Sequence, residues 1–279
     1  MIILRSDGYS EERWSLKIDT HLHLDEPWLS DEELRKRTIE DITAHKIVTW
    51  AQSCDIPSYE RTLEYAKQSE YIFPSFGILP WYANEYMSRL DDVAQRCDDA
   101  LMLGEIGLHE GERIKSTTEE QDALFAVFLE AAEKHNKIMN CHFRGGLEPK
   151  GLEVMKSYSI KKGIFHSFSG PPKMIGELND NGFYVSYGIT QRELSGNRRE
   201  YFEERISRVH DDLLILEVDV LEKEQNYLPP SQVIPEILKT IASIRKTTPE
   251  EIEALNHNNV LRLISGDSKL RRMAELLND

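Results

Sequence analysis

The sequence predicts an α/β fold, a (β/α)8 TIM barrel in a single domain. Short apolar segments rich in β-branched residues alternate with longer amphipathic segments along the chain. Eight short segments occur, and their carboxyl ends run from His21 to Asp219 at a mean spacing of about 28 residues, enough for one crossover helix between parallel strands. The 279 residues suit one such barrel, so we expect residues 1–279 to form one domain with its core at about 16–265.

The eight expected strands follow one another in the order required for a barrel. They cover residues 16–24, 46–53, 71–78, 101–108, 137–143, 163–169, 183–189 and 213–221. An open doubly wound sheet is the structural alternative, but no GxGxxG turn follows the first strand to support it. No Ser/Gly-rich linker or internal repeat suggests a second domain.

Helices are expected between the strands and after the last one. Capping boxes at Ser30 with Glu33 and at Thr117 with Glu120 predict helices over 34–46 and 121–135. Beyond the eighth strand, helical patterns cover 231–246, 249–256 and 260–264. Strand and helix therefore alternate along the whole chain, and helices complete it.

Composition excludes several classes of protein. Hydrophobic residues make up 40% and charged residues 30%, which is typical of a globular chain, and no apolar run reaches the ~20 residues that a membrane span needs. The first residues carry Asp7, Glu11 and Glu12 and lack a basic segment, so we expect no signal peptide. Three widely separated cysteines without a CxxC pair indicate free thiols and a cytoplasmic location: Cys54, Cys97 and Cys141.

The negative net charge limits how this protein can bind nucleic acid. Lys and Arg number 34 and Asp and Glu 49, a formal charge of −15. Such a chain would repel long duplex DNA unless positive charge or metal gathers in one cleft. Coating of DNA is disfavoured, whereas local phosphate chemistry stays open. We infer no membrane and no stable protein partner, and a monomer is the default.

The first expected strand ends in two histidines, His21 and His23. Side chains alternate between the faces of a strand, so both imidazoles lie on one face and can converge on one ion. On its own such a pair is more often structural than metal-binding. The metal-binding interpretation is favoured here because four more potential ligands lie at the carboxyl ends of other expected strands, where the active sites of barrels are found: Glu105, His142, His166 and Asp219.

Each of these four residues also has a structural interpretation. Glu105 or Asp219 could cap a helix, His142 could be a hydrogen-bonded core histidine, and His166 could face outward. Together, however, four imidazoles and two carboxylates on one rim are costly to desolvate without a cation. Six ligands exceed what one tetrahedral ion uses, and a carboxylate can bridge two cations about 3.5–4 Å apart. We therefore expect two divalent metal ions, with zinc, magnesium and manganese as candidates.

The motifs that hold these residues occur in a characteristic order. IDTHLHLD, GEIGL, CHFRG, HSFSG and LEVD are followed by Asn259, Arg262 and Leu263 in an N-x-x-R-L pattern. From about Lys17 to Leu263 the sequence resembles the TatD-type metal-dependent deoxyribonucleases of the amidohydrolase superfamily.

The resemblance implies a site and an activity. His21 and His23 with Asp219 would hold one metal ion, His142 and His166 the other, and Glu105 would bridge them. The implied activity is phosphodiester hydrolysis by a water that the two ions activate, with Asp219 and Glu105 as catalytic residues and Asp219 accepting the proton. The implied substrates are DNA ends or short single strands, cleaved as by a 3′–5′ exonuclease.

Three positions depart from the family pattern. Leu79 precedes a proline where the family usually shows histidine, His109 replaces an aspartate, and Val220 replaces a small residue followed by proline. None removes an assigned ligand, but all three lie near the cleft in the family. An ester, lactone or amide hydrolase with the same metal site is therefore the alternative function, although Glu105 stands where related lactonases carry a carboxylated lysine. A barrel that only binds is a third possibility.

Secondary candidates follow from their positions in the motifs. Arg144 shares the face of His142 and could hold a phosphate or carboxylate of the substrate, with a surface ion pair as an equal alternative. Glu217 could orient a metal ligand or pair with a buried cation. His109 could be an extra ligand or proton shuttle, although a loop histidine without a site role is favoured. The aromatic pair at 81–82 could stack on a base or cover the barrel. The segment 169–171 has the pattern of a helix start, which could offer N–H groups to an anion.

Overall fold

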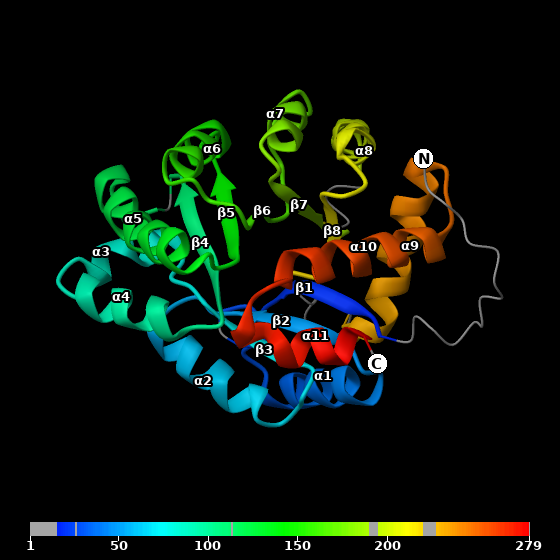
Figure 1. The fold of residues 1–279 in the computed structure, drawn as a ribbon, viewed down its shortest axis with the longest axis horizontal. Coiled ribbons are helices and arrows are strands. Elements are labelled where there is room, and N and C mark those ends of the chain that lie inside the picture. The colour runs from blue at the N-terminus through cyan, green and yellow to red at the C-terminus, as the bar shows by residue number, and fades with distance from the viewer. Residues whose placement is uncertain (1–15, 26, 113, 190–194, 220–226, 279) are drawn as a thin grey trace.

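The computed structural model describes residues 16–25, 27–112, 114–189, 195–219 and 227–278. Within them, eight parallel strands follow one another in a single sheet in the order β1 to β8, with helices around the outside (Figure 1). A parallel bridge between Leu22 and Asp219 joins the last segment to the first strand. There His23 N–H donates to the Asp219 carbonyl at 3.1 Å, and Asp219 N–H donates to the His21 carbonyl at 2.6 Å. The predicted (β/α)8 TIM barrel is confirmed.

Every strand lies at a predicted segment. The bounds are β1 Ile18–Leu22, β2 Val48–Gln52, β3 Ile72–Phe76, β4 Met102–His109, β5 Met139–Arg144, β6 Gly163–Phe165, β7 Tyr184–Tyr187 and β8 Leu214–Leu216. β4 and β5 each run one residue beyond their predicted ends. That extension is important for the site, because it carries His109 and Arg144 onto the barrel rim as strand residues.

The helices agree with the sequence pattern in type and differ at some ends. Their bounds are α1 Glu32–Ala44, α2 Ile56–Ala66, α3 Ala83–Tyr86, α4 Leu90–Asp99, α5 Thr118–His135, α6 Glu148–Ser157, α7 Met174–Asp180, α8 Asn197–Arg208, α9 Pro230–Arg245, α10 Pro249–Ile264 and α11 Arg271–Asn278. Thr117 and Glu120 form the predicted capping box of α5. The capping box predicted at Ser30 is wrong, since Asp31 caps α1 by accepting from Leu34 N–H.

The end of the chain is more helical than predicted. α10 is one helix where two patterns were expected, because His257 and Asn259 between the two patterns are buried, and Asn256 and Asn259 bond to backbone groups of β1 and β8. α11 follows without having been expected. The three cysteines are free, as predicted, and the structure shows that they are buried. No helix among the described residues combines the length and apolarity of a membrane span. Two sequence-based predictions concern residues outside the described ones: the lack of a signal peptide at residues 1–14 and the departure from the family pattern at Val220.

Two glycines let neighbouring strands approach closely at the rim. A Cβ on Gly107, where φ is +142°, would lie 2.1 Å from the carbonyl oxygen of His142. A Cβ on Gly77 would lie 2.3 Å from the backbone nitrogen of Glu105. Any side chain at either position would push the backbone of a candidate ligand away. Close backbone contacts therefore explain why glycine occupies both positions.

The N-x-x-R-L segment on α10 ties the helix to the turn before β8. The side-chain amide of Asn259 donates to the carbonyls of Asp211 and Leu214, both at 2.7 Å. Arg262 donates to the carbonyl of Asp212 at 2.7 Å. These residues satisfy backbone acceptors at the base of the last strand, so their role in this structure is to hold β8 in place.

We expect Asn259→Ala to lower the free energy of unfolding by about 2–3 kcal/mol, because two carbonyls lose their buried amide donor. Urea denaturation followed by circular dichroism measures the change. Asn181→Ala is the matched control, since that exposed amide, just after α7, donates only to the Glu177 carbonyl among the residues that the structure describes, and it should change stability by less than about 0.5 kcal/mol. Equal midpoints for the two variants would contradict the role assigned to Asn259.

Candidate metal centre

The structure brings all six predicted ligands to one end of the barrel. His21 lies on β1, Glu105 on β4 and His142 on β5. His23 and His166 directly follow β1 and β6, and Asp219 lies shortly after β8. Five of the six are buried with less than a tenth of their surface exposed. The carboxylate of Asp219 is more open, with 26% of its side chain exposed. Of the two carboxylates in the cluster, that of Asp219 is therefore the more accessible to solvent.

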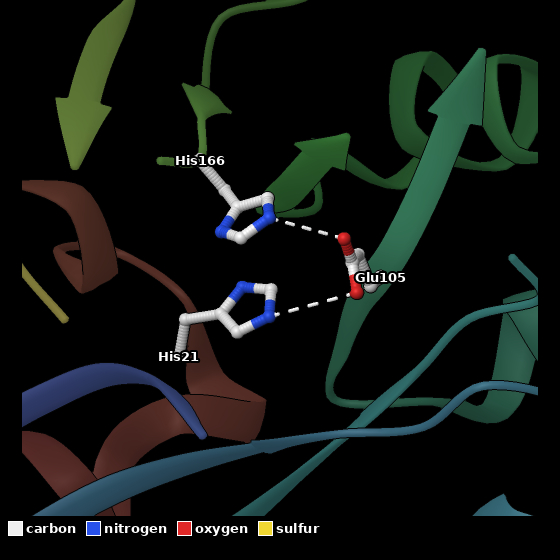
Figure 2. Close-up of side chains that lie close together, drawn as sticks. All are labelled: His21, Glu105 and His166. Atoms are coloured by element: carbon white, nitrogen blue, oxygen red, sulfur yellow. Dashed lines mark ion pairs between the residues drawn. The ribbon is translucent and has the colours of Figure 1, made fainter. Parts of the chain in front are cut away.

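The Glu105 carboxylate lies at the centre of the cluster. Its Oε2 atom is 2.9 Å from His23 Nε2 and 3.7 Å from His21 Nε2. Its Oε1 atom is 3.0 Å from His166 Nε2 and also contacts His142 Nδ1. Figure 2 shows His21 and His166 side by side, their rings stacked with centroids 3.9 Å apart and each facing the carboxylate. Each oxygen of Glu105 thus meets two imidazoles.

Asp219 completes the cluster from the barrel seam, the place where the segment after β8 pairs with the end of β1. Its Oδ1 atom lies 3.8 Å from His21 Nε2. The backbone there is left-handed, with φ of 68°, a conformation that aspartate tolerates better than most residues. Ligand atoms within 4.8 Å of one another form three groups, which are His21 with Glu105 and His166, His21 with His23 and Asp219, and His166 with Glu217 and Asp219. His142 is in none of these groups and joins the cluster through Glu105.

Burial and charge set the protonation of these groups. Burial opposes the charge of Glu105, but the imidazoles of His142 and His166 outweigh it and hold the pKa of Glu105 well below its ordinary value. Burial lowers the pKa of His142 to about 4. Burial likewise opposes a charge on His166, yet the carboxylates of Glu217 and Glu105 raise its pKa to about 10. The carboxylates therefore favour positive charge at His166, whether a proton or a metal ion supplies it.

The chemistry of the donors fits divalent cations. The Nδ1 atom of His21 is 2.9 Å from the side-chain oxygen of Asn140, whose own amide donates to the Thr20 carbonyl at 3.0 Å. An amide oxygen only accepts, so His21 carries its proton on Nδ1 and turns the lone pair of Nε2 toward the site. His23 Nε2 lies 3.2 Å from His21 Nε2. Nitrogen and carboxylate donors that converge in this way are the ligand set of a divalent metal ion.

Sequence reasoning missed two residues that support the ligands, Asp19 and Asn140. The Asp19 carboxylate accepts from the backbone N–H groups of His21 at 3.1 Å and of Val218 at 2.9 Å, and so links β1 to the segment that carries Asp219. Both residues stand two positions before a predicted ligand, at 21 and 142. The alternation of faces along a strand was therefore a signal that could have found them.

Glu217 lies where it can orient a ligand. Both of its carboxylate oxygens are 3.3 Å from His166 Nδ1, and Ser186 donates to one of them. The alternative of a buried lysine or arginine partner has no support, because Glu217 forms no ion pair with either type among the described residues. A carboxylate behind a metal-ligating imidazole fixes the ring and raises its basicity.

His109 contacts the site, contrary to the favoured expectation of a loop histidine without a role there. It ends β4, and its Nδ1 atom lies 2.9 Å from His142 Nε2. Trp81, of the predicted aromatic pair, meets both histidine rings edge-on at 5.7 Å. Leu79 is instead fully buried, and its N–H donates to the Cys54 carbonyl at 2.9 Å. Of the two described departures from the family pattern, only His109 reaches a candidate ligand.

Arg144 lies beside the cluster. Its Nη1 atom donates to the carbonyls of Phe143 at 3.0 Å and His166 at 3.4 Å. The alternative of a surface ion pair is not found among the described residues. The segment 169–171 is not a helix start, because α7 begins only at Met174. Its carbonyls, at Ser169 and Gly170, accept hydrogen bonds from Arg205 instead.

Comparison with known proteins identifies the family. The model of the TatD related DNase family matches residues 18–265. The chain belongs to this family. It is 24% identical over 269 residues to a Danio rerio protein named as a candidate deoxyribonuclease, tatdn3, covering 89% of this chain and 97% of the relative. It is 23% identical over 257 residues to the Bacillus subtilis metal-dependent hydrolase YabD, covering 88% and 97%.

A solved structure has the same fold. The TatD homologue YjjV from Escherichia coli K12 superposes with a TM-score of 0.74 at 20% identity, covering 88% of this chain and 97% of that one. The predicted TatD-type metal-dependent hydrolase is confirmed, and the family together with the His, Glu and Asp cluster supports divalent metal binding.

We expect Asn140→Ala to weaken metal binding about 10- to 100-fold, because His21 loses the acceptor that keeps its Nε2 lone pair directed at the site. Competition with a chromogenic chelator measures the affinity for zinc or manganese. Asn140→Asp keeps an acceptor oxygen and should retain most of the affinity. If the alanine and aspartate variants lose affinity equally, the hydrogen bond to His21 is not the cause.

Proposed function

We propose that this protein is a deoxyribonuclease that hydrolyses phosphodiester bonds at DNA ends or in short single strands, as a 3′–5′ exonuclease with two divalent ions. The observation that carries the proposal is the Glu105 carboxylate, whose two oxygens each contact two imidazoles. A carboxylate placed between two groups of ligands is the arrangement of a dinuclear site. Membership of the TatD related DNase family supports DNA as the substrate.

Each residue of the cluster has a place in this proposal. His21, His23 and Asp219 would hold one ion and His142 and His166 the other, with Glu105 between them. Divalent ions held there would stabilise charge on the phosphoryl oxygens and lower the pKa of a water near the substrate. Glu105 and Asp219 are the catalytic carboxylates of the proposal, since Glu105 sets the spacing of the two ligand groups.

The proton from the attacking water is assigned to Asp219. Its side chain is 26% exposed, whereas that of Glu105 is 4% exposed and that of Glu217 is fully buried. Asp219 is therefore the carboxylate of this group that a water and a substrate can reach together. The His166 ring, held from behind by Glu217, keeps its Nε2 atom toward Glu105.

Substrate binding is assigned to Arg144 in this proposal. Its guanidinium has donors beyond the Nη1 group that bonds to the Phe143 and His166 carbonyls. A phosphate oxygen next to the scissile bond is the partner that a planar guanidinium favours. Trp81 also meets the His142 ring edge-on at 5.7 Å.

We expect chelator-stripped protein to leave a 5′-labelled single-stranded DNA intact and to degrade it once magnesium, manganese or zinc is returned. A ladder that shortens while keeping its label indicates 3′–5′ degradation, whereas immediate release of a labelled mononucleotide indicates the opposite direction. Glu105→Gln should lower kcat at least about 100-fold, because a bridging ligand is lost. Glu153→Gln, an exposed carboxylate on α6, is the control and should stay within about twofold.

Other outcomes would redirect or refute the proposal. Full activity of Glu105→Gln would place the chemistry outside this cluster. No cleavage of DNA with any of the three ions, together with hydrolysis of an ester, lactone or amide, would support the alternative hydrolase with the same metal site.

A further inference from the structure

A second feature, a cavity of about 840 Å³, adjoins the candidate metal centre. Ser167, which directly follows the candidate ligand His166, lines it, and so does Arg144 at the end of β5. The opposite wall is α8, which contributes Arg198, Tyr201 and Arg205. The cavity therefore begins beside the candidate ligands, at residues close to them in the chain, and extends toward α8. Its volume falls within the ~300–1,000 Å³ typical of ligand sites.

The charge of this cavity is opposite to that of the whole chain. Three arginines line it against one carboxylate, that of Glu148. None of the three, Arg144, Arg198 and Arg205, forms an ion pair with a carboxylate of the described residues. In a chain of formal charge −15, such positive charge without a partner needs an anionic ligand or remains solvated.

Helix α8 divides its arginines between two faces. Arg198, Tyr201 and Arg205 follow one another at intervals of three and four residues, so they share one face, which lines the cavity. Arg199 and Arg208 lie outside the cavity and pair with glutamates of the same helix, Glu203 at 2.7 Å and Glu204 at 2.7 Å. Among the described residues, α8 thus pairs its arginines with glutamates away from the cavity, whereas its two arginines at the cavity have no carboxylate partner.

Arg205 supplies an independent sign of a missing ligand. It is only 7% exposed, and its Nη1 atom donates to the carbonyls of Ser169 at 3.0 Å and Gly170 at 3.3 Å. Its buried Nε–H group has no acceptor within the described part of the chain. A buried guanidinium with a free donor is costly, and an anion in the cavity would remove that cost.

Tyr201 adds a surface for stacking. Its side chain is 56% exposed, although large hydrophobic residues elsewhere in the described chain are mostly buried. Single-stranded nucleic acids bind through this combination of cationic groups for the backbone and exposed aromatic rings for the bases.

We propose that this cavity binds the stretch of single-stranded nucleic acid next to the phosphodiester at the metal centre. Arg144, Arg198 and Arg205 contact backbone phosphates, and the ring of Tyr201 stacks on a base. The inference rests on the proposed nuclease function and adds the path of the strand. The finite volume suits a few nucleotides and no long duplex, in keeping with the acidic surface of the chain.

Binding of 5′-labelled oligo-dT of two to ten nucleotides tests the proposal, measured by fluorescence anisotropy on the full chain with chelator present so that the DNA stays intact. Affinity should rise with length until the cavity is filled. Arg198→Gln should weaken binding of the decamer about 5- to 10-fold and reduce the slope of log K against log salt by about 0.7. Tyr201→Ala should weaken it about 10-fold, and Tyr201→Phe should not.

Arg199→Gln is the matched control. It removes the same charge from the neighbouring position of α8, but from an arginine that is paired with Glu203 outside the cavity. Its affinity should stay within twofold of the wild type. Arg198 and Tyr201 are exposed, so their substitution leaves the core intact, whereas the buried Arg205 is left unchanged because its loss could impair folding.

The outcomes separate this inference from the proposed function. Binding that depends on length and on Arg198, without cleavage by any metal-loaded form, supports the cavity and refutes the nuclease. Cleavage of DNA with equal binding by the Arg198→Gln and Arg199→Gln variants supports the nuclease and overturns the cavity. Equal affinity for thymidine monophosphate, inorganic phosphate and the decamer also overturns it, since the cavity would then hold a single phosphate group.

Discussion

The closure of the barrel at Asp19 is the constraint on which the rest of the site depends. The Asp19 carboxylate accepts one N–H from His21 and one from Val218, and the backbone of Asp219 pairs with the strand that carries His21 and His23. Burial raises the pKa of Asp19 well above its ordinary value, and these backbone donors act against that shift. The bonds that close the fold therefore also place the ligands from opposite ends of the chain against one another. Glu105 then contacts the imidazoles that this seam brings within reach.

The net negative charge of the chain and the positive charge expected at its candidate site concern different parts of the molecule. A chain of formal charge −15 is a poor partner for long DNA, yet a phosphodiesterase must bring a phosphate to its centre. Divalent ions at the candidate ligand cluster would supply positive charge at one point, and the arginines of the adjoining cavity, which have no carboxylate partner among the described residues, would supply it along a short path. In the proposed function, the acidic remainder of the chain would limit binding to segments that fit this path. Attraction is thus local and repulsion general, which suits ends and single strands better than duplexes.

The departures from the family pattern differ in weight because of where their side chains lie. Leu79 is buried in the core, so its effect on a substrate can only be indirect. His109 is at hydrogen-bonding distance from His142 and beside Trp81, so it changes the partner of a candidate ligand. A neutral imidazole can donate or accept where an aspartate only accepts, and this gives His142 a different neighbour without removing it from the cluster.

The sequence by itself determined the barrel, the order of its strands and the six residues that cluster at its rim, because strand periodicity and strand ends are local properties that parallel packing turns into one rim. Even Asn140 and Asp19 stood at positions that the same periodicity singles out. The arginines of α8 were beyond such reasoning, since the charged run of that helix has the composition of an ordinary solvated surface and only packing shows which side faces the cavity. The contact of His109 with His142 also needed the fold, because β4 extends one residue further than its apolar pattern. The tertiary structure alone decided the contacts between side chains of distant segments. No local sequence pattern shows which face of a helix packs against which loop.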